Sequence, residues 1–461
     1  MPKQAVCGLL ALAALLITIT GCSSVDLGEN DQLELEPSEI KPQHLEIEQP
    51  PETSHQKPEV SLGTLTMSKK PRITTVSSTS RDLQELSYGN LSFTSDLYSY
   101  LRTSDANILF SPYSISLALA MIYAGAKGET ESQMAETLNF SLPQEKLHPA
   151  FNNLSIELGQ QGKSAEEKDE KGLRLNIVNA TWGQQEYTFL AQYLDTLAEY
   201  YGAGIYLLDF INTPEPSRIY INEWIDEQTE GRIEELLPPG SINEATRMVL
   251  TNVIYFKASW MKPFEEASTY NGEFQLLEGS FVNVPMMKQI ESFGYTKGSN
   301  YQAVELLYSG GEVSMVILLP EKGEFRSFEK SLNQQLIFAI QDSIEYRQVD
   351  LSMPLFEFDS SLGLKKIFSA MGMSIPFSET ADFSGLTSNR DIHISDILHK
   401  AYISVDEAGT EATAATGVVM ALVGIPEPPI EVTVDSPFIF FIRDIGTGSI
   451  LFIGRVLDPS A

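Results

Sequence analysis

The stretch "VDEAGTEATAATGVV", Val405–Val419, lies close to the C-terminal end of the chain and decides how the fold is interpreted. A turn-like glycine comes near its start, and a run of Ala, Thr and Val with a second glycine and one charged residue follows. A surface loop is normally more polar than this, and a buried strand is bulkier and more β-branched. The composition therefore predicts a segment that occupies both states at different times.

The residues that follow Gly409 alternate in a way that suits a strand with one buried face. Gly409 lacks a Cβ and suits a hinge, and strand residues point to alternate faces. From Thr410 to Val423 the segment would span about 46 Å when extended, which is enough for a central strand. One face is small or apolar throughout, and the other carries the single charge, Glu411. The first face comprises Thr410, Ala412, Ala414, Thr416, Val418 and Met420, and the second comprises Glu411, Thr413, Ala415, Gly417, Val419 and Ala421.

Composition limits the class of protein and its partners. The chain has 461 residues, and its hydrophobic content of 43% is ample for a large core. The 31 basic and 62 acidic residues give a formal charge of −31. A surface this acidic repels phosphate backbones, so we expect no nucleic-acid partner.

Cysteine and histidine usage argues against thiolate and metal sites. The chain has two cysteines, Cys7 and Cys22, and both lie near the N-terminus. We therefore expect no disulfide and no thiolate metal site in the rest of the chain. The five histidines form no pair with metal-ligand spacing, so we predict no metal and no cofactor: His44, His55, His148, His393 and His399.

The N-terminus predicts a lipoprotein signal. One lysine precedes an apolar run, Ala5–Ile19, which is short for a membrane span and suits a secretory signal core. "ITGC", Ile19–Cys22, then resembles the lipobox of prokaryotic lipoproteins, in which cleavage precedes a cysteine that becomes lipidated. The alternative is an ordinary signal peptide with a chance cysteine. In a Gram-negative host, Ser23 after Cys22 would favour the outer membrane.

The next residues predict a tether. The segment from Ser23 to about Arg81 is rich in Pro, Glu and Ser and has little bulky apolar content. Such a segment cannot bury enough surface to offset its ordering entropy. We therefore predict three parts: a signal peptide in 1–21, a lipid-anchored acidic linker in 22–81 and a folded domain in 82–461.

The folded domain mixes helical and strand patterns without strict alternation. Phe93, Leu97, Tyr100 and Leu101 have helical spacing. Pro112 suits the first turn of a buried helix. Near-continuous apolar strands follow, and "DIGTGS" before the last strand has hairpin-turn chemistry. The order predicts an α+β fold with large antiparallel or mixed sheets.

Six motifs, in order, make the domain resemble a serpin. They cover 107–130, 222–233, 250–264, 381–386, 394–416 and 432–456, and the resemblance extends from about Leu83 to Pro459. It implies one domain with three β-sheets surrounded by helices, and an exposed reactive loop between Thr410 and about Pro437. Two examples are "NILFSPYSISLALAMIYAGAKGET" and "LTNVIYFKASWMKPF".

The resemblance implies a suicide mechanism, in which a protease attacks the loop and forms an acyl-enzyme. The cut loop then inserts as an extra strand of the main sheet, and the protease is deformed before deacylation. Native stability is kinetic in this scheme. By family spacing from Glu407, the scissile bond is Val423–Gly424, or Leu422–Val423 if the loop is one residue shorter. The implied hinge comprises Glu407, Gly409, Thr410, Glu411, Ala412, Thr413, Ala414 and Ala415; Thr413 stands where the family mostly has Ala.

The loop composition indicates the class of target. Thr410–Pro437 contains no Lys or Arg, so trypsin-like proteases have nothing to pair with there. Small aliphatic residues suit elastase- or subtilisin-like pockets, and Leu422 or Met420 suits a chymotrypsin-like one. The predicted partner is a serine, or alternatively a cysteine, protease.

Five further residues match structural positions of the family. Ser111, Ser114, Asn252 and His399 match a buried polar cluster under the main sheet, in which His399 bridges strands and regulates sheet opening. Ser114 and Asn252 would also suit ordinary helix and strand polar positions. Trp260 matches the tryptophan at the top of the sheet, where the loop first enters; plain core packing is the alternative.

Two other functions compete with inhibition. A non-inhibitory serpin that binds or carries a ligand is the first, but such members often carry bulky, charged or Pro residues in the hinge. A hydrolase is the second, and no G-x-S-x-G nucleophile motif supports it. We therefore expect an inhibitor rather than an enzyme: a monomer outside the cytoplasm, held at the outer membrane or cell surface through Cys22.

Overall fold

The computed structural model describes residues 63–75, 78–166, 174–388, 391–410 and 428–461. The chain divides into two units, 1–59 and 60–461, and the second is called the body here. Among the described residues, no helix combines the length and the apolar character that crossing a bilayer requires.

A seven-stranded main sheet forms one layer of the body. Strand β5 is buried on both faces along almost its whole length, as its near-continuous apolar sequence predicts. In spatial order the strands are β1 (Thr64–Thr66), β4 (Ile205–Leu208), β3 (Arg174–Gln184), β5 (Met248–Ser259), β13 (Gly409–Thr410), β12 (Asp396–Val405) and β11 (Phe356–Gly363).

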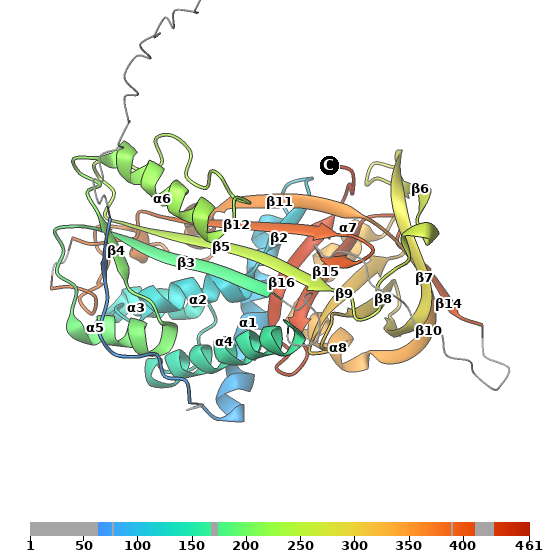
Figure 1. Ribbon diagram of the computed structural model, residues 1–461, viewed down its shortest axis with the longest axis horizontal. Helices are drawn as coiled ribbons and strands as arrows, with labels where there is room; N and C mark the ends of the chain where they lie inside the picture. Colours follow the sequence, from blue (N-terminus) through green and yellow to red (C-terminus); the bar gives the residue numbers. More distant parts are fainter. Residues whose placement is uncertain (1–62, 76–77, 167–173, 389–390, 411–427) are drawn as a thin grey trace, which may run out of the picture. The chain divides into compact units, whose positions relative to one another are not determined.

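A second, nine-stranded ladder lies toward the other end of the body (Figure 1). Its long strand β7 pairs with β10 through residues 286–295 and with β8 through 294–297, so the two smaller sheets of the expected three join into one ladder. The spatial order is β14 (Ile430–Thr433), β10 (Glu345–Pro354), β7 (Phe281–Lys297), β8 (Tyr301–Leu307), β9 (Val313–Pro320), β15 (Phe438–Asp444), β16 (Ile450–Val456) and β2 (Ile108–Phe110), with β6 (Tyr270–Gln275) beside β7.

The helices begin where local capping chemistry places them. Thr79 and Asp82 form a reciprocal capping box at the start of α1, and Pro112 is the first residue of α2. The helices are α1 (Ser80–Leu101), α2 (Pro112–Tyr123), α3 (Gly128–Thr137), α4 (Gln144–Glu166), α5 (Ala191–Thr196), α6 (Pro214–Gln228), α7 (Phe325–Ser331), α8 (Gln334–Ser343) and α9 (Lys365–Ala370), with short turns η1 (Leu197–Tyr201), η2 (Glu266–Ser268) and η3 (Ile375–Phe377).

Helices cover both faces of the main sheet (Figure 1). Helix α6 packs on one face through an apolar cluster that includes Trp182 of β3 and Ile221 and Ile225 of the helix. Helix α2 packs against β3 and β5 in the main core. In α1, the predicted core positions include Phe93 and are buried, except that Tyr100 is 43% exposed.

The chain joins the body earlier than the predicted boundary at residue 82. Strand β1 pairs antiparallel with β4 at the edge of the main sheet. The ammonium of Lys70 lies 3.2 Å from Asp195 Oδ2 and 3.0 Å from Glu199 Oε1, and the Ile73 amide donates to the Glu199 carbonyl at 2.8 Å. Residues 63–75 therefore pack on the body. A three-residue strand in a Ser- and Pro-rich segment leaves no periodicity to detect.

Candidate functional site: the hinge and the seam of the main sheet

The predicted hinge glycine already lies inside the main sheet. Strand β13 occupies the space between β5 and β12, with Gly409 opposite Ser259 and Thr410 opposite Ala258. Thr410 also pairs with Val405 across β12. The loop therefore starts from within the sheet, and its first two residues are the beginning of an additional strand.

A tight turn directs the chain from β12 back into the sheet. The Asp406 amide donates to the Gly409 carbonyl at 2.9 Å. The Asp406 carboxylate accepts from the amides of Ala408 and Gly409, each at 2.9 Å. Burial, the largest influence, raises the pKa of Asp406. The carboxylate thus satisfies backbone donors that the turn would otherwise leave without partners.

Gly409 is required by both space and backbone conformation. Its φ is +151°, which L side chains rarely adopt. A Cβ at this position would lie 2.6 Å from Ser259 Cα and 2.8 Å from Trp260 N, so the neighbouring backbone would have to move. The glycine predicted as a hinge is therefore also the residue that allows close approach to β5.

Thr410 sits in a closed polar pocket at the top of the sheet. It is fully buried, and its hydroxyl lies 2.9 Å from the Tyr308 hydroxyl. The Tyr308 ring stacks on Trp260 with centroids 4.5 Å apart and an interplanar angle of 12°. The Trp260 indole donates to the Asp406 carbonyl at 3.0 Å. Trp260, predicted where the loop first enters the sheet, thus contacts the hinge turn, and Tyr308 is a partner that the sequence did not reveal.

Glu407 contacts the connection that follows β5. Its carboxylate accepts from the Thr269 hydroxyl at 2.5 Å, and its carbonyl accepts from the Phe264 amide at 2.7 Å. These contacts fix the turn that follows β12 relative to the segment 264–269. Glu407, Gly409 and Thr410 are the only predicted hinge residues within the described part of the chain.

Below the hinge the main sheet is closed. Strands β5 and β12 pair directly and in parallel, from Val249 and Asp396 to Tyr255 and Tyr402. Any further strand between them must break these pairs. At the hinge end, β13 therefore separates β5 from β12. Below it, β5 and β12 are paired directly through 249–255 and 396–402, and this part is called the seam.

A buried polar row crosses this seam. Asn252 of β5 lies opposite His399 of β12 and opposite Asn179 of β3. The Asn252 carbonyl oxygen lies 2.5 Å from His399 Nδ1, and its amide donates to the Ser114 hydroxyl at 2.6 Å and to Asn179. His399 Nε2 accepts from the Ser111 amide at 3.2 Å, so the proton sits on Nδ1. The four predicted residues thus meet, and Asn179 extends the row.

His399 is neutral in this environment. It is fully buried, and desolvation lowers its pKa from the ordinary 6.5 to about 3. Its two hydrogen bonds join β12 to β5 and to the N-terminal end of α2, where Ser111 caps the helix. Separating the two strands would break the bond to Asn252. This geometry is consistent with the predicted role in sheet opening, which stays a prediction.

Several predicted site residues lie outside the described residues. These are the lipidation site Cys22, the remaining hinge residues and both candidate scissile bonds. In the part of the chain that the structure describes, no group of three or more His, Cys, Asp or Glu side chains is arranged to hold a metal ion. The hinge residues outside the described ranges are Glu411, Ala412, Thr413, Ala414 and Ala415, and the bond residues are Leu422, Val423 and Gly424.

A family model described as serpin (serine protease inhibitor) matches residues 88–459, which is most of the chain. The chain is a serpin. This confirms the family and fold predicted from the six motifs. Mouse leukocyte elastase inhibitor A is 38% identical over 389 residues, which cover 82% of this chain and all of the relative. Such relatives are named as protease inhibitors and not as enzymes, in agreement with the predicted class.

Solved serpin structures resemble the body over its whole extent. The thermophilic serpin tengpin in its native state matches with a TM-score of 0.75 and 28% identity, over 84% of this chain and 97% of tengpin. Human thyroxine-binding globulin with its ligand matches with a TM-score of 0.71 and 31% identity, over 82% of this chain and 99% of that one. The fold is thus shared with a protein that is named for binding thyroxine.

Proposed function

We propose that this serpin is a suicide inhibitor that traps a protease by completing the strand that β13 begins. The position of Gly409 and Thr410 between β5 and β12 carries this proposal. Both residues pair with β5, Thr410 also pairs with β12, and the next residues in sequence are small apart from Glu411. Extension of β13 would replace the direct pairing of β5 with β12 by pairs on both sides of a new strand, which adds hydrogen bonds to the sheet.

The target we propose is a serine protease of the elastase, subtilisin or chymotrypsin type, cut at Val423–Gly424 or, as second choice, Leu422–Val423. Support comes from the absence of Lys and Arg in Thr410–Pro437 and from the similarity to leukocyte elastase inhibitors. A cysteine protease with an aliphatic pocket is compatible with the same sequence.

We also propose that the monomer acts at a membrane outside the cytoplasm, anchored through a lipid on Cys22. The lipobox-like "ITGC" supports this. The alternative function is a non-inhibitory serpin that carries a ligand, in the way that human thyroxine-binding globulin holds its own ligand. Residues 410–415 of the hinge are small except for Glu411, and this composition favours inhibition over the alternative.

The proposal is tested by mixing residues 23–461 with an elastase-, a subtilisin- and a chymotrypsin-like protease. Denaturing gels report adducts, and mass spectrometry maps the cut. We expect an adduct that survives denaturation and a new N-terminus at Gly424 or Val423. Cleavage in the loop without an adduct, followed by no gain in thermal stability of the cleaved chain, would refute suicide inhibition and favour the carrier function.

A further inference from the structure

A pocket of about 550 Å³ lies outside the hinge and the seam, and its lining includes none of their residues. Its walls come from the β6–β7 connection, the β9–α7 connection, the segment between β14 and β15, and the residues after β16. A volume of this size suits a small organic ligand, for which typical sites measure about 300–1,000 Å³. The question is which chemistry the lining would accept.

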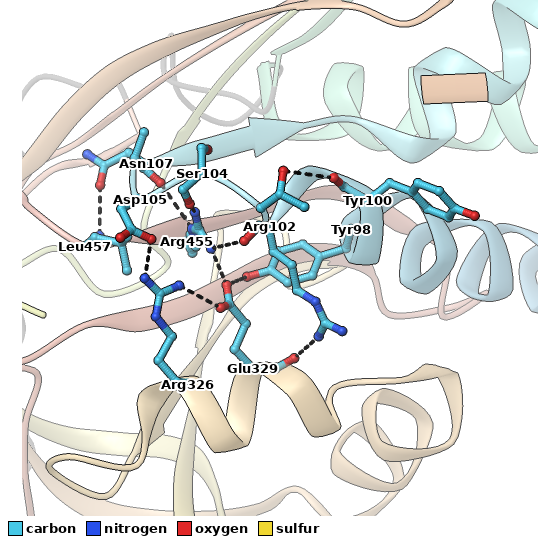
Figure 2. Close-up of polar contacts among 12 residues, drawn as sticks. Tyr98, Tyr100, Arg102, Ser104, Asp105, Asn107, Arg326, Glu329, Arg455 and Leu457 are labelled. Carbon is cyan, nitrogen blue, oxygen red and sulfur yellow. Dashed lines mark hydrogen bonds and ion pairs between the residues drawn. The ribbon is translucent and has the colours of Figure 1, made fainter. Parts of the chain in front are cut away.

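One wall of the pocket contains an arginine whose charge is already compensated. Arg326 of α7 forms an ion pair with Asp105 and lies 3.5 Å from Glu329 Oε2 (Figure 2). Glu329 in turn accepts from the Tyr98 hydroxyl at 3.0 Å and pairs with the fully buried Arg455 at 2.5 Å. This network fixes Arg326 in the wall, so its guanidinium is not available to attract an anion.

Three other carboxylates of the lining have no cationic partner among the described residues. They are Glu278, Glu321 and Asp458. The lysine nearest in sequence, Lys322, pairs with Asp435 at 2.7 Å instead. A concave surface with one sign of charge concentrates its field, and the acidic chain as a whole adds to it. The pocket therefore favours a cation.

An unpartnered hydroxyl also faces the pocket. Ser436 is only 6% exposed and lines the pocket, and within the described ranges nothing hydrogen-bonds to its side chain. Among the described residues, the buried polar atoms without a partner do not include the Ser436 hydroxyl, so it is accessible from the pocket and can hydrogen-bond a ligand. Between the polar groups the surface is apolar, with Leu276, Leu277 and Phe325 among the lining residues.

We infer that this pocket binds an organic amine. Its ammonium group would face Glu278, Glu321 and Asp458, its hydrocarbon or aromatic part would lie on the leucines and Phe325, and a polar atom would bond Ser436. The inference is independent of the proposed inhibition, because the pocket contains no hinge or seam residue.

Three indole probes that differ in charge test the inference on the full-length protein. Tryptamine is cationic, tryptophol is its neutral counterpart, and indole-3-acetate is anionic. Calorimetry or ligand-observed NMR gives their affinities at low salt. We expect tryptamine to bind at least about tenfold more tightly than tryptophol, since charge-assisted bonds contribute more than neutral ones. No binding of indole-3-acetate is expected.

Variants locate the bound amine. The pair Glu278→Gln and Glu321→Gln should weaken tryptamine binding about tenfold, and Ser436→Ala should weaken it further without changing the charge preference. The control pair, Glu186→Gln with Glu244→Gln, removes the same charge from exposed sites outside the lining and should leave affinity unchanged. Equal affinity for all three probes, or equal losses in the pocket and control pairs, would overturn the inference. A thermal melt confirms that each variant is folded.

Discussion

The substitution Thr410→Arg tests strand insertion most directly. Thr410 is fully buried between β5 and β12, and the Tyr308 hydroxyl and the Trp260–Tyr308 stack close its pocket. The hydrogen bond that the described residues offer the side chain here comes from the Tyr308 hydroxyl and not from a carboxylate. An uncompensated buried charge costs about 3–5 kcal/mol. In the native state the variant would avoid this cost by leaving the sheet. If the transition state of insertion buries the arginine again, the rate falls by roughly 10²–10⁴.

The assay compares Thr410→Arg with Thr413→Arg. The second variant introduces the same side chain at a residue that strand alternation places on the opposite face. The parent and Thr413→Arg should form adducts that resist denaturation, whereas Thr410→Arg should be cleaved as a substrate and release active protease. Stoichiometry of inhibition, measured by titration of residual activity, quantifies the shift. If Thr410→Arg trapped protease as efficiently as the parent, insertion at this seam would be the wrong mechanism.

Three further predictions concern the hinge, the seam and the core. Gly409→Ala should expel the hinge from the sheet, because its Cβ would meet the β5 backbone; faster limited proteolysis near the hinge would show this, and unchanged proteolysis would contradict it. At the seam, burial lowers the pKa of His399 from 6.5 to about 3, so its stabilisation is complete above about pH 6.5 and is lost as pH falls toward 3. Between pH 7 and about pH 5, the free energy of unfolding of the parent, measured with denaturant, should therefore fall by about 2 kcal/mol more than that of His399→Gln. Parallel pH profiles of the two proteins would refute this prediction. In the core, Glu329→Ala leaves Arg455 buried without its carboxylate partner, so the free energy of unfolding in the same assay should fall by about 3–5 kcal/mol. The control Asp105→Ala removes an exposed carboxylate, and a larger fall for this control than for Glu329→Ala would contradict the prediction.

The sequence predicted the chemistry of the hinge but not its present position. Small residues and Gly409 indicate that the segment can become a strand. How many of its residues lie in the main sheet depends on two competing free energies, that of extending β13 and that of keeping β5 paired with β12. No local sequence pattern encodes the difference between them. Asn179 and Tyr308 were missed for a related reason: each acquires its role from a strand neighbour distant in sequence. Strand β1 was missed because three residues carry no period.

The seam cluster was predictable only through the family resemblance. His399 alone in a β-rich segment would suit many buried positions. Its pairing with Asn252 requires β5 and β12 to be parallel neighbours. The order of the strands along the chain does not specify this, and β13, which follows β12, also lies between the two strands at one end. The amine pocket had no sequence signal, since its walls come from connections that are distant in sequence.

Strand β1 also fixes where the N-terminal segment joins the body relative to the path of a trapped protease. Thr64, Leu207, Gly183 and Met248 form one row across β1, β4, β3 and β5. Under the proposed mechanism, a strand continuing the register of Gly409 with Ser259 would bring Met420 to this row and the acylated residue just beyond it.

Within that row, Met420 of the added strand would lie four strand spacings, about 19 Å, from Thr64 of β1, where the chain joins the sheet. A protease of ordinary size has a radius of about 22 Å, so it would come to rest over the place where the tether meets the body. The trapped protease would thus be held at the pole of the body where β1 pairs with β4, opposite the pole where β14 lies. Figure 1 shows these poles, with β4 and α6 at one end and β10 and β14 at the other.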